Sequence, residues 1–277
     1  MGLKFQNKII ITIMVRSQRG NKMIVDFHSH IIPAVDDGAR DMKEALDMIR
    51  LAMESGTKKI VATPHYHVRR GFQVSYEEIK DLVNNLRKEV KNNKIDIEIV
   101  CGQEVGYNSD ILDLYEKGHI GCIEGTNYML IEFPLGQFST MKALDNIYEL
   151  QIKGVRPIIA HPERYKRFIN DPLVINRFIK EGYLFQLNVG SLNGDFGKEV
   201  KNLADHYLKQ GLYSTYGSDG HRLDDRNTDM TKGRKILRKK YKEFLVKMEE
   251  ETKAILENDL VTYSGNEIKK KKFFDLF

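Results

Sequence analysis

The chain of 277 residues contains no tryptophan, two cysteines and six prolines. Two cysteines, Cys101 and Cys122, are too few for a disulfide framework, and they indicate a reducing compartment. The longest apolar run spans residues 9–15 and is interrupted by Thr12, whereas a membrane-spanning helix needs about 20 residues. The hydrophobic share of 41% is enough for a large core, and the composition excludes collagen-like, disordered and disulfide-rich chains.

The two signs of charge are unevenly placed along the chain. Lysine and arginine outnumber aspartate and glutamate by 44 to 39, which gives a formal net charge of +5. The excess lies in residues 1–22 and 232–277, and the middle of the chain is acidic. Basic ends can contact nucleic acid or anionic lipid. A solvated helix face and tail is the simpler interpretation, so we predict no nucleic-acid partner and no stable membrane insertion.

Regular structure is expected to begin at Met23, directly before the first patterned strand. We interpret residues 1–22 as an N-terminal extension, from an upstream start or dispensable to the fold; an extra edge strand is the alternative. No small-residue cleavage site follows its apolar part, which argues against a signal peptide. We predict a single domain over residues 23–260 and a basic C-terminal tail over residues 261–277.

Short β-branched runs alternate with longer helical patterns from Met23 onward. Seven strands are predicted, at residues 23–31, 59–63, 95–102, 128–133, 156–160, 183–189 and 212–217. Asp41 and Ser75 are each followed three residues later by glutamate, as in a capping box at a helix start. Asp171 precedes a proline, a further helix-start signal. Glycines stand where helices should end before the next strand, at Gly56, Gly154, Gly182 and Gly211.

This alternation predicts an α/β fold with a parallel sheet and helical crossovers. Seven units in one run fit a closed or nearly closed barrel of seven strands better than two separate domains. A doubly wound open sheet is the alternative. A final helix over residues 231–258 is expected to cover one side.

Residue types that bind metal ions lie where the predicted strands end. Six such segments are Asp26-Phe27-His28-Ser29-His30, Thr63-Pro64-His65-Tyr66-His67, Gln103-Glu104, Glu132-Phe133-Pro134, His161-Pro162-Glu163-Arg164 and Ser218-Asp219-Gly220-His221. They hold six of the eight histidines; His119 and His206 lie elsewhere. Loops at the carboxyl ends of parallel barrel strands share one face, so these residues are expected to converge on one pocket.

The expected chemistry of this cluster is metal binding. His28 and His30 are two residues apart in a strand, so their side chains point the same way and can hold one ion together. Imidazole and carboxylate ligands suit Mn, Fe and Zn. Carboxylates can bridge ions, so the acidic residues of the cluster indicate two or three ions. These carboxylates are Glu104, Asp219, Glu132 and Asp37.

Motifs for other nucleophiles are absent from the sequence. Neither Cys101 nor Cys122 has the arginine six positions later that cysteine-dependent tyrosine phosphatases require. The sequence also has no Gly-x-x-x-x-Gly-Lys-Ser/Thr loop and no Gly-x-Ser-x-Gly elbow. Cys101 lies in a strand pattern and is expected to be a core residue. Water activated by bound metal ions therefore remains as the nucleophile.

Taken in order, these motifs resemble the polymerase-and-histidinol-phosphatase (PHP) superfamily. The similarity is greatest to the manganese-dependent protein-tyrosine phosphatases encoded with bacterial capsule and exopolysaccharide genes. It covers residues 23–248 and rests on six segments: 26–39 with Asp36-Asp37-Gly38, Ala62-Thr63-Pro64-His65, Gly102-Gln103-Glu104, Ile131-Glu132-Phe133-Pro134, His161-Pro162-Glu163-Arg164 and Gly217-Ser218-Asp219-Gly220-His221.

The resemblance implies a distorted seven-stranded β/α barrel of the TIM-like PHP type, holding three ions that are usually manganese. The metal ligands it implies are His28, His30, Asp37, His65, Glu104, Glu132, His161, Asp219 and His221. It also implies that Arg164 and Arg226 grip the phosphate, which suits the bidentate guanidinium fork. For Arg226 an ordinary loop arginine is the alternative. His67 in the loop after His65 is a spare histidine, which we expect to be exposed to solvent.

The function implied by the resemblance is a cytoplasmic, manganese-dependent hydrolase that removes phosphate from phosphotyrosine on proteins. The implied substrate is a phosphorylated bacterial tyrosine kinase that controls capsule or exopolysaccharide biosynthesis. A phosphatase for a small molecule such as histidinol phosphate is the first alternative. A non-catalytic scaffold and a nuclease are the others, and the complete ligand set and the acidic middle of the chain argue against them.

Overall fold

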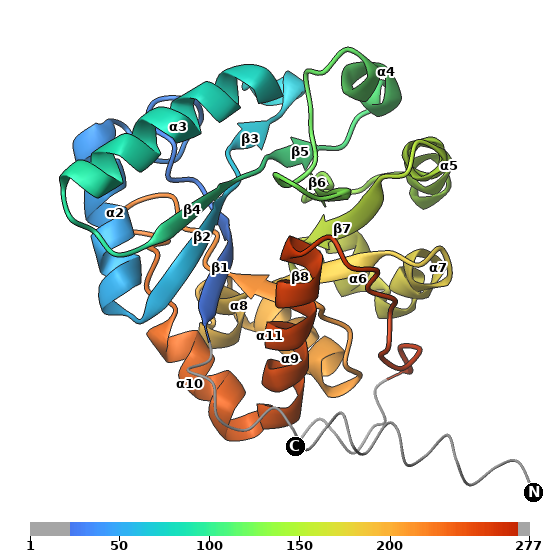
Figure 1. Ribbon diagram of the computed structural model, residues 1–277. Helices are drawn as coiled ribbons and strands as arrows, with labels where there is room; N and C mark the ends of the chain where they lie inside the picture. The colour runs from blue at the N-terminus through green and yellow to red at the C-terminus, as the bar shows by residue number, and fades with distance from the viewer. Residues whose placement is uncertain (1–22, 271–277) are drawn as a thin grey trace, which may run out of the picture.

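A computed structural model describes residues 23–270 of the chain (Figure 1). All paired strands run parallel. The strands are β1 (Ile24–Ser29), β2 (Thr57–Ala62), β3 (His65–Tyr66), β4 (Glu98–Cys101), β5 (Glu104–Gly106), β6 (Tyr128–Glu132), β7 (Arg156–Ala160), β8 (Leu184–Asn188) and β9 (Thr215–Gly217). They form a three-stranded sheet in the order β1-β2-β4 and a six-stranded sheet in the order β3-β5-β6-β7-β8-β9. The predicted α/β fold with parallel strands is confirmed.

The sequence located seven of the nine strands and missed β3 and β5. Each of these short strands follows an interruption in the chain, at Pro64 and at Gly102. Pro64 has no N–H to donate to a strand ladder, and Gly102 lies so close to β2 that a Cβ there would be 3.2 Å from Val61. Beyond both interruptions the chain pairs again, with His65 opposite Glu104. The two interruptions therefore bring His65 and Glu104, both of residue types that bind metal ions, opposite each other in β3 and β5.

The first and last strands lie side by side at their carboxyl ends. Ser29 and Gly220 form a parallel bridge. The backbone N–H of Asp219 donates to the carbonyl of His28 at 2.7 Å, and that of His30 donates to the carbonyl of Gly220 at 2.9 Å. This junction brings segments from opposite ends of the sequence to the same edge of the strands.

Helices surround the strands (Figure 1). The α-helices are α2 (Met42–Glu54), α3 (Tyr76–Asn92), α4 (Ile111–Glu116), α5 (Thr140–Ile152), α6 (Lys166–Asn170), α7 (Ile175–Lys180), α8 (Val189–Asn193), α9 (Lys198–Lys209), α10 (Thr231–Lys240) and α11 (Lys242–Leu256). Three 3-10 turns are η1 (Val68–Arg70), η2 (Pro162–Arg164) and η3 (Pro172–Val174). The predicted caps are present at Asp41, Ser75 and Asp171, and a full capping box forms at Ser75.

The predicted final helix 231–258 is divided into α10 and α11 at Tyr241. Tyr241 leaves helical geometry, with φ −137° and ψ 39°. Its ring is buried and its hydroxyl donates to Asp205 of α9. Burial of this tyrosine requires the chain to turn, which helical periodicity alone does not reveal.

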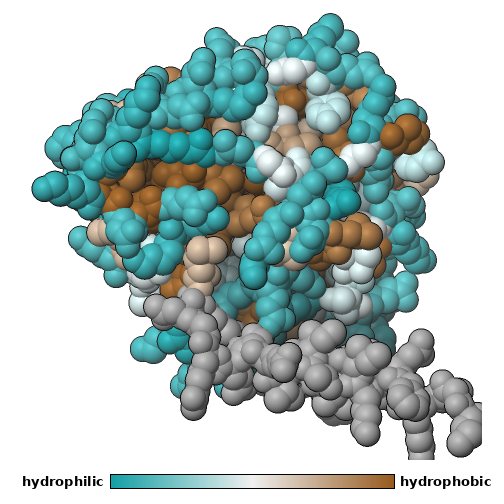
Figure 2. Space-filling view, viewed as in Figure 1, coloured by the Kyte–Doolittle hydropathy of each residue, from teal (hydrophilic) through white to brown (hydrophobic). Residues whose placement is uncertain are grey.

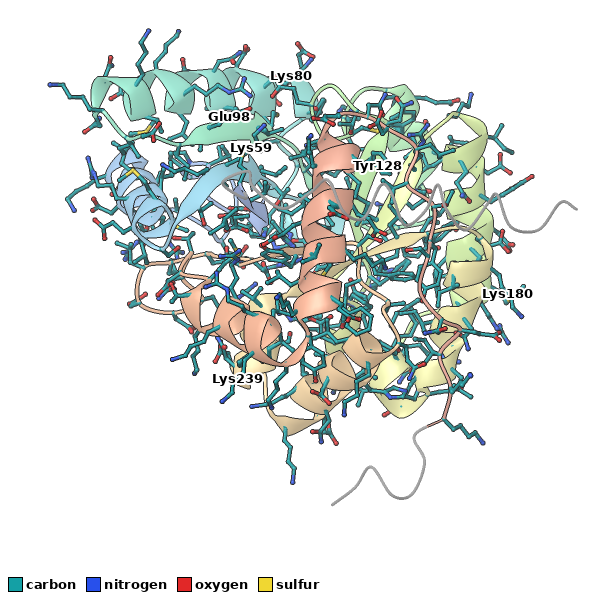
Figure 3. All side chains as sticks on the ribbon, turned by 60° about the horizontal axis from the view of Figure 1, so that its bottom comes forward. Lys59, Lys80, Glu98, Tyr128, Lys180 and Lys239 are labelled. Atoms are coloured by element: carbon teal, nitrogen blue, oxygen red, sulfur yellow. The ribbon has the colours of Figure 1, made fainter. Side chains whose placement is uncertain are left out.

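The core has an interior part and two outer layers. The interior includes Val25, Val61, Tyr128 and Leu184 from the strands, and Ile255 of α11 packs with them. Helices α2 and α3 pack on the outside of the three-stranded sheet, and the helices from α4 to α9 pack against the six-stranded sheet. On the face shown in Figure 2, hydrophilic residues predominate over the outer helices and hydrophobic residues gather toward the middle. Where β2 and β4 pair, Lys59 contacts Glu98 at 2.8 Å (Figure 3).

The structure describes part of the predicted C-terminal tail but none of the predicted N-terminal extension. The predicted extension 1–22 lies outside the described residues. Of the predicted tail 261–277, the part up to Lys270 is described and packs on the domain. The N–H of Asn266 donates to the carbonyl of Gln210, and Ile268 is buried. Within residues 23–270, no helix has the length and apolar character that crossing a bilayer requires.

Candidate metal centre

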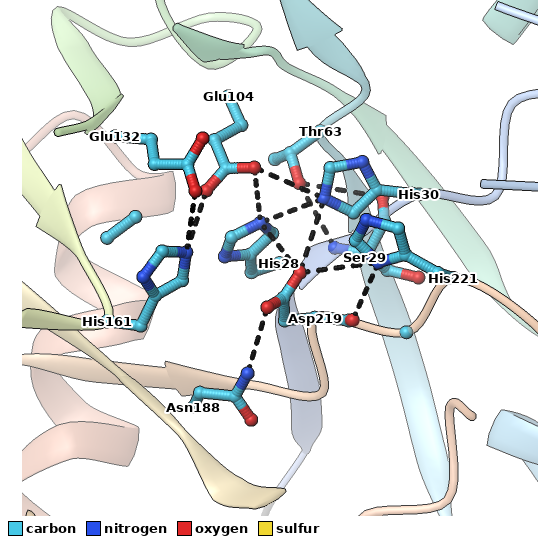
Figure 4. A network of polar contacts seen from close by, with 12 residues as sticks. His28, Ser29, His30, Thr63, Glu104, Glu132, His161, Asn188, Asp219 and His221 are labelled. Carbon is cyan, nitrogen blue, oxygen red and sulfur yellow. Dashed lines mark hydrogen bonds and ion pairs between the residues drawn. The ribbon is translucent and has the colours of Figure 1, made fainter. Parts of the chain in front are cut away.

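Four buried side chains from three parts of the chain meet at the junction of β1 and β9 (Figure 4). His28 and His30 come from the end of β1, Glu104 from β5, and Asp219 follows β9. The Nε2 atoms of His28 and His30 are 3.1 Å apart. Each lies 3.3 Å from Glu104 Oε2, and they lie 3.5 and 3.4 Å from Asp219 Oδ1. Four potential ligand atoms therefore surround one small space.

Two further groups share members with the first. His65 Nε2 and His221 Nε2 lie 3.5 and 3.6 Å from Asp37 Oδ1, and His30 completes this group. His65 Nδ1 lies 3.0 Å from Glu104 Oε2 and 3.8 Å from Glu132 Oε2, which defines the third group. The shared imidazoles and carboxylates join all three groups into one cluster.

His161 lies at the edge of the third group. Its Nε2 is 3.0 Å from Glu104 Oε1 and 3.7 Å from Glu132 Oε1. The structure thus brings together all nine residues that the sequence proposed as ligands. Eight are almost completely buried, and the Asp37 side chain is 37% exposed.

Two side chains that were not predicted from the sequence, Asp36 and Gln186, orient the histidines. Asp36 Oδ2 accepts from His30 Nδ1 at 2.7 Å and from the backbone N–H of His65 at 2.8 Å. Gln186 Oε1 accepts from His28 Nδ1 at 3.1 Å. These bonds place the protons on Nδ1 and direct Nε2 of His28 and His30 into the cluster, as partners of metal-binding histidines commonly do.

The cluster fits divalent cations. Six buried polar atoms in it have no hydrogen-bond partner among the described residues: Asp37 Oδ1, His65 Nδ1, Glu104 Oε2, His161 Nδ1, Asp219 Oδ1 and His221 Nε2. Buried polar atoms normally have a partner, so a set of facing donor atoms without one indicates a ligand. Imidazole nitrogens and carboxylate oxygens are the atoms that Mn, Fe and Zn accept.

The electrostatics of the cluster also favour cations. Burial raises the pKa of Glu132 well above its usual range, and the neighbouring Glu104 and Asp219 raise it further. The pKa of His28 is raised above its usual value. Burial alone would lower the pKa of this imidazole, but the charges of Glu104 and Asp219 outweigh burial. Burial and the adjacent Arg164 lower the pKa of His161 to about 4, so this imidazole is neutral at pH 7, the form that binds metal.

Arg164 and Arg226 meet at Asp219. Arg164 Nη1 and Arg226 Nη2 both contact Asp219 Oδ2 at 2.6 Å, and Asn188 Nδ2 donates to the same oxygen at 2.9 Å. Both guanidinium groups lie over the ring of Phe196, 4.4 and 5.8 Å from its centroid. Asp219 therefore presents Oδ1 to the histidines and Oδ2 to the arginines.

A cavity of about 350 Å³ opens over the cluster. Arg164 and Arg226 line it, and so do Arg70 and His67. His67, which we expected to lie in solvent, is half-buried, and a Cβ at Gly106 would be 2.7 Å from its ring. Arg70 contacts Asp37 Oδ2 at 2.6 Å and lies over the Phe72 ring. The sequence offered no signal that set Arg70 apart from the other loop arginines.

Backbone conformation marks the same residues. His161, Asp219 and Arg226 have φ values of 29°, 52° and 52°, a region that residues other than glycine rarely adopt. Such strained positions cluster at functional sites, where the surrounding structure holds them. Cys101, in contrast, is fully buried in the core beside α2 and α3, as predicted.

The fold and this cluster define a class of protein: an α/β protein with a candidate metal centre at the carboxyl ends of parallel strands. Residues 24–257 match the family described as capsular polysaccharide synthesis, CpsB/CapC. The chain belongs to this family.

Several relatives support the assignment. The tyrosine-protein phosphatase YwqE of Bacillus subtilis is 29% identical over 92% of this chain and all of its own length. The putative tyrosine-protein phosphatase CapC of Staphylococcus aureus is 31% identical over 91% of this chain and all of its own length. The tyrosine-protein phosphatase CpsB of Streptococcus pneumoniae is 30% identical over 79% of this chain and 91% of its own length.

Solved structures agree with the sequence relatives. A structure from a study of YwqE of B. subtilis and CpsB of S. pneumoniae, described as metal-dependent tyrosine phosphatases, superposes with a TM-score of 0.84. It is 28% identical and covers 90% of this chain and all of the other. A phosphotriesterase homology protein from Escherichia coli has a TM-score of 0.55 at 12% identity over 86% of this chain and all of the other, and it supports the fold alone.

Proposed function

We propose that this chain is a metal-dependent protein-tyrosine phosphatase, and that it hydrolyses phosphotyrosine on proteins. The observation that carries the proposal is the cluster of nine potential ligands, eight of them almost completely buried, with two arginines converging on Asp219. The relatives named tyrosine-protein phosphatases extend over most of the chain, which supports the same activity here. We further propose that the two sheets together constitute a distorted seven-stranded barrel of the PHP type, in which β2 with β3, and β4 with β5, each make one interrupted strand.

The proposed ligands are the nine residues named from the sequence. Three overlapping groups of potential ligands support three ions, with His30, His65 and Glu104 shared between groups. Mn²⁺ is the proposed metal, and Fe or Zn would suit the same donor atoms. When bound, the ions supply Lewis-acid activation of water and of the phosphoryl group.

Arg164 and Arg226 are proposed to bind the phosphate. Each uses one guanidinium nitrogen on Asp219, which leaves other N–H groups for phosphate oxygens. The Nε of Arg226 is buried and has no hydrogen-bond partner among the described residues. These two cations neutralise charge on the phosphoryl oxygens, where charge stabilisation contributes most to the rate. Asp219 keeps both arginines close to the ligand cluster.

The leaving group explains why the cavity needs no strong acid. Tyrosine leaves as a phenolate, which is a weaker base than an alkoxide and requires less protonation. His67 lines the cavity, and burial lowers its pKa, so it is neutral at pH 7. We propose that it donates a hydrogen bond to the departing oxygen rather than a full proton.

The proposed substrate is a phosphorylated tyrosine kinase that controls capsule or exopolysaccharide synthesis in the cytoplasm. Support comes from the family, which is described by capsular polysaccharide synthesis. We propose no nucleic-acid partner. Lys80, Lys180 and Lys239 project from separate sides of the molecule (Figure 3), which does not resemble a basic face that follows a phosphate backbone. The domain is proposed to span residues 23–260, with residues 1–22 as an N-terminal extension and residues 261–277 as a C-terminal tail, of which the described part up to Lys270 packs on the domain.

The test compares hydrolysis of a phosphotyrosine peptide and of histidinol phosphate by metal-stripped protein, with and without Mn²⁺. The variants are His161→Ala, Arg226→Ala and Arg226→Lys. Arg238→Ala is the matched control, because Arg238 lies exposed on α10. Bound metal is measured for each variant in the same preparations.

We expect peptide turnover that requires Mn²⁺ and is lost in His161→Ala together with part of the bound metal. Arg226→Ala should lose turnover while it keeps its metal, and Arg226→Lys should recover little, because lysine lacks the guanidinium fork. Turnover of histidinol phosphate alone would contradict the protein-tyrosine phosphatase proposal. If neither the peptide nor histidinol phosphate is hydrolysed with Mn²⁺ present, phosphatase activity on these two substrates is contradicted.

A further inference from the structure

A second cavity, of about 310 Å³, adjoins the cavity over the metal centre. Pro134, in the loop after β6, lines both cavities. The second cavity has aromatic walls from Tyr107 and Phe138 and receives Arg69 and Lys142. An extended peptide whose phosphotyrosine enters the first cavity can therefore place a neighbouring side chain in the second.

The second cavity is positively charged. No carboxylate is among the residues that line it, and Asp145, one turn further along α5, does not line it. Arg69 and Lys142 are both exposed and make no ion pair with the described residues. The next residue, Arg70, is instead paired with Asp37 in the metal centre. Two neighbouring cations without a counter-charge favour an anionic ligand.

The loop that carries Arg69 is held in place by its backbone. His67 and Phe72 form an antiparallel bridge, with the N–H of His67 donating to the carbonyl of Phe72 at 2.7 Å. The 3-10 turn η1 lies between them and ends at Gly71, where φ is 80°. Successive residues of this closed turn line the two cavities, Arg70 the first and Arg69 the second. One short element therefore contributes a side chain to each cavity.

A third cavity, rich in aspartate, lies on the side of β7 away from Arg69 and Lys142. This cavity, of about 550 Å³, follows β8 and β9 and shares Arg226 with the cavity over the metal centre. Its lining includes four aspartates and two cations, so its formal charge is net negative: Asp195, Asp224, Asp225 and Asp229 against Arg226 and Lys232. An anionic side chain of a bound peptide would be repelled there and attracted on the side of Arg69 and Lys142.

We propose that the cavity between Arg69 and Lys142 is a specificity subsite for an aspartate or glutamate of the phosphotyrosine substrate. The acidic residue lies on one side of the phosphotyrosine along the peptide, because the other side meets the carboxylates beyond Arg226. This inference rests on the proposed function and adds the class of peptide that the site prefers.

The experiment measures kcat/KM for peptides in which glutamate, glutamine or lysine occupies each of the three positions on either side of phosphotyrosine. The full chain is assayed with Mn²⁺, and turnover of p-nitrophenyl phosphate by the same preparation is the reference. The charge-reversed variant Arg69→Glu/Lys142→Glu is compared with Arg238→Glu/Lys239→Glu on α10. A repeat in 1 M NaCl tests the electrostatic origin without any substitution.

We expect the wild-type chain to prefer glutamate to glutamine on one side only, by about two- to fivefold, as exposed ion pairs allow. The charge-reversed variant should prefer lysine at that position, and high salt should remove the wild-type preference. Equal turnover of all peptides, a preference on both sides, or a preference that survives charge reversal would overturn the subsite alone. No turnover of any phosphotyrosine peptide would overturn the proposed function and the subsite with it.

Discussion

At the scale of single residues, two adjacent aspartates have different roles. Asp37 directs a carboxylate oxygen at His65 and His221, whereas Asp36 accepts hydrogen bonds from His30 Nδ1 and two backbone N–H groups. The sequence placed Asp37 among the bridging carboxylates, and the family resemblance implied it as a metal ligand. Nothing in the residue type alone separates the two, because the distinction depends on which way each side chain turns in a folded loop.

Removal of the charge of Asp36 should weaken metal binding without removing a ligand. In Asp36→Asn the amide no longer fixes His30 with a full negative charge, so we expect Mn²⁺ affinity to fall by about 10- to 100-fold. Titration calorimetry measures the affinity, and circular dichroism checks the fold. Asp96→Asn is the control, since Asp96 is exposed and pairs only with Lys58 among the described residues. Unchanged affinity in Asp36→Asn would contradict the orienting role.

The two cysteines should be chemically inert in the folded protein. Burial, together with Glu124, raises the pKa of Cys101 from 9.0 to about 12, and burial raises that of Cys122 to about 12. Both thiols therefore stay protonated at pH 8, and iodoacetamide should alkylate them far more slowly than it does in urea. Because folding favours the neutral thiols, their contribution to the free energy of unfolding is fully present below pH 9. That contribution is lost as the pH rises toward 12, since the unfolded chain ionises its thiols first. Mass spectrometry follows the labelling.

The same cysteines test the metal-based chemistry. Cys101→Ala/Cys122→Ala should retain phosphotyrosine hydrolysis, apart from any loss that parallels a lower content of folded protein. Rapid alkylation of the native chain at pH 8, or inactivation of this variant while it remains folded, would show that a thiol participates.

The ligand residues were predictable because their types are informative at strand ends, whereas their supporting residues were not. Gln186 and Asn188 lie in or at the end of β8 among buried apolar residues, and a polar residue inside such a run was the signal that could have found them. Phe196 gave no such signal. Its contact with Arg164 and Arg226 depends on the path of the loop between α8 and α9.

At the scale of secondary-structure elements, the sequence predicted strands and caps where periodicity and local chemistry agree. β7 was predicted to the residue, and positive φ values occur at Gly56, Gly154, Gly182 and Gly211 as expected at helix ends. The short strands β3 and β5 were missed because two or three residues carry no period. They form through pairing between distant segments, which local pattern does not encode.

Close approach between β9 and β1 should make Gly217 intolerant of a side chain. A Cβ at Gly217 would lie 2.6 Å from the backbone nitrogen of His28 and 2.8 Å from its Cβ. We expect Gly217→Ala to push the two strands apart, to reduce the free energy of unfolding by about 1–3 kcal/mol, and to abolish phosphatase activity. Urea denaturation and the peptide assay measure both effects.

Gly136→Ala is the matched control for this prediction. No atom lies within 4 Å of a Cβ built at Gly136, and its φ is not in the positive range, so the substitution meets open space. It should leave the stability nearly unchanged. Equal stability and equal activity of the two variants would show that the strands at Gly217 can separate without consequence for the centre.

At the scale of the whole molecule, the centre joins strands from both ends of the described chain. His28 and His30 come from the first strand, Glu104 and His161 from the middle, and Asp219 follows the last strand. These groups bring carboxylates into a buried space, where their mutual repulsion opposes folding. A cation that binds only when all these strands are in place must stabilise the complete fold rather than one part of it.

Metal removal should therefore lower the thermal stability of the entire domain in one transition. We expect dialysis against EDTA to decrease the Tm by several degrees and Mn²⁺ to restore it in a saturable way, since a ligand at 100 times its Kd adds about 2.7 kcal/mol. Scanning calorimetry measures the shift. His161→Ala should show a smaller shift, whereas His119→Ala, outside the cluster, should show the full one. An identical Tm with and without Mn²⁺ would mean that the nine residues do not bind the metal in the folded protein.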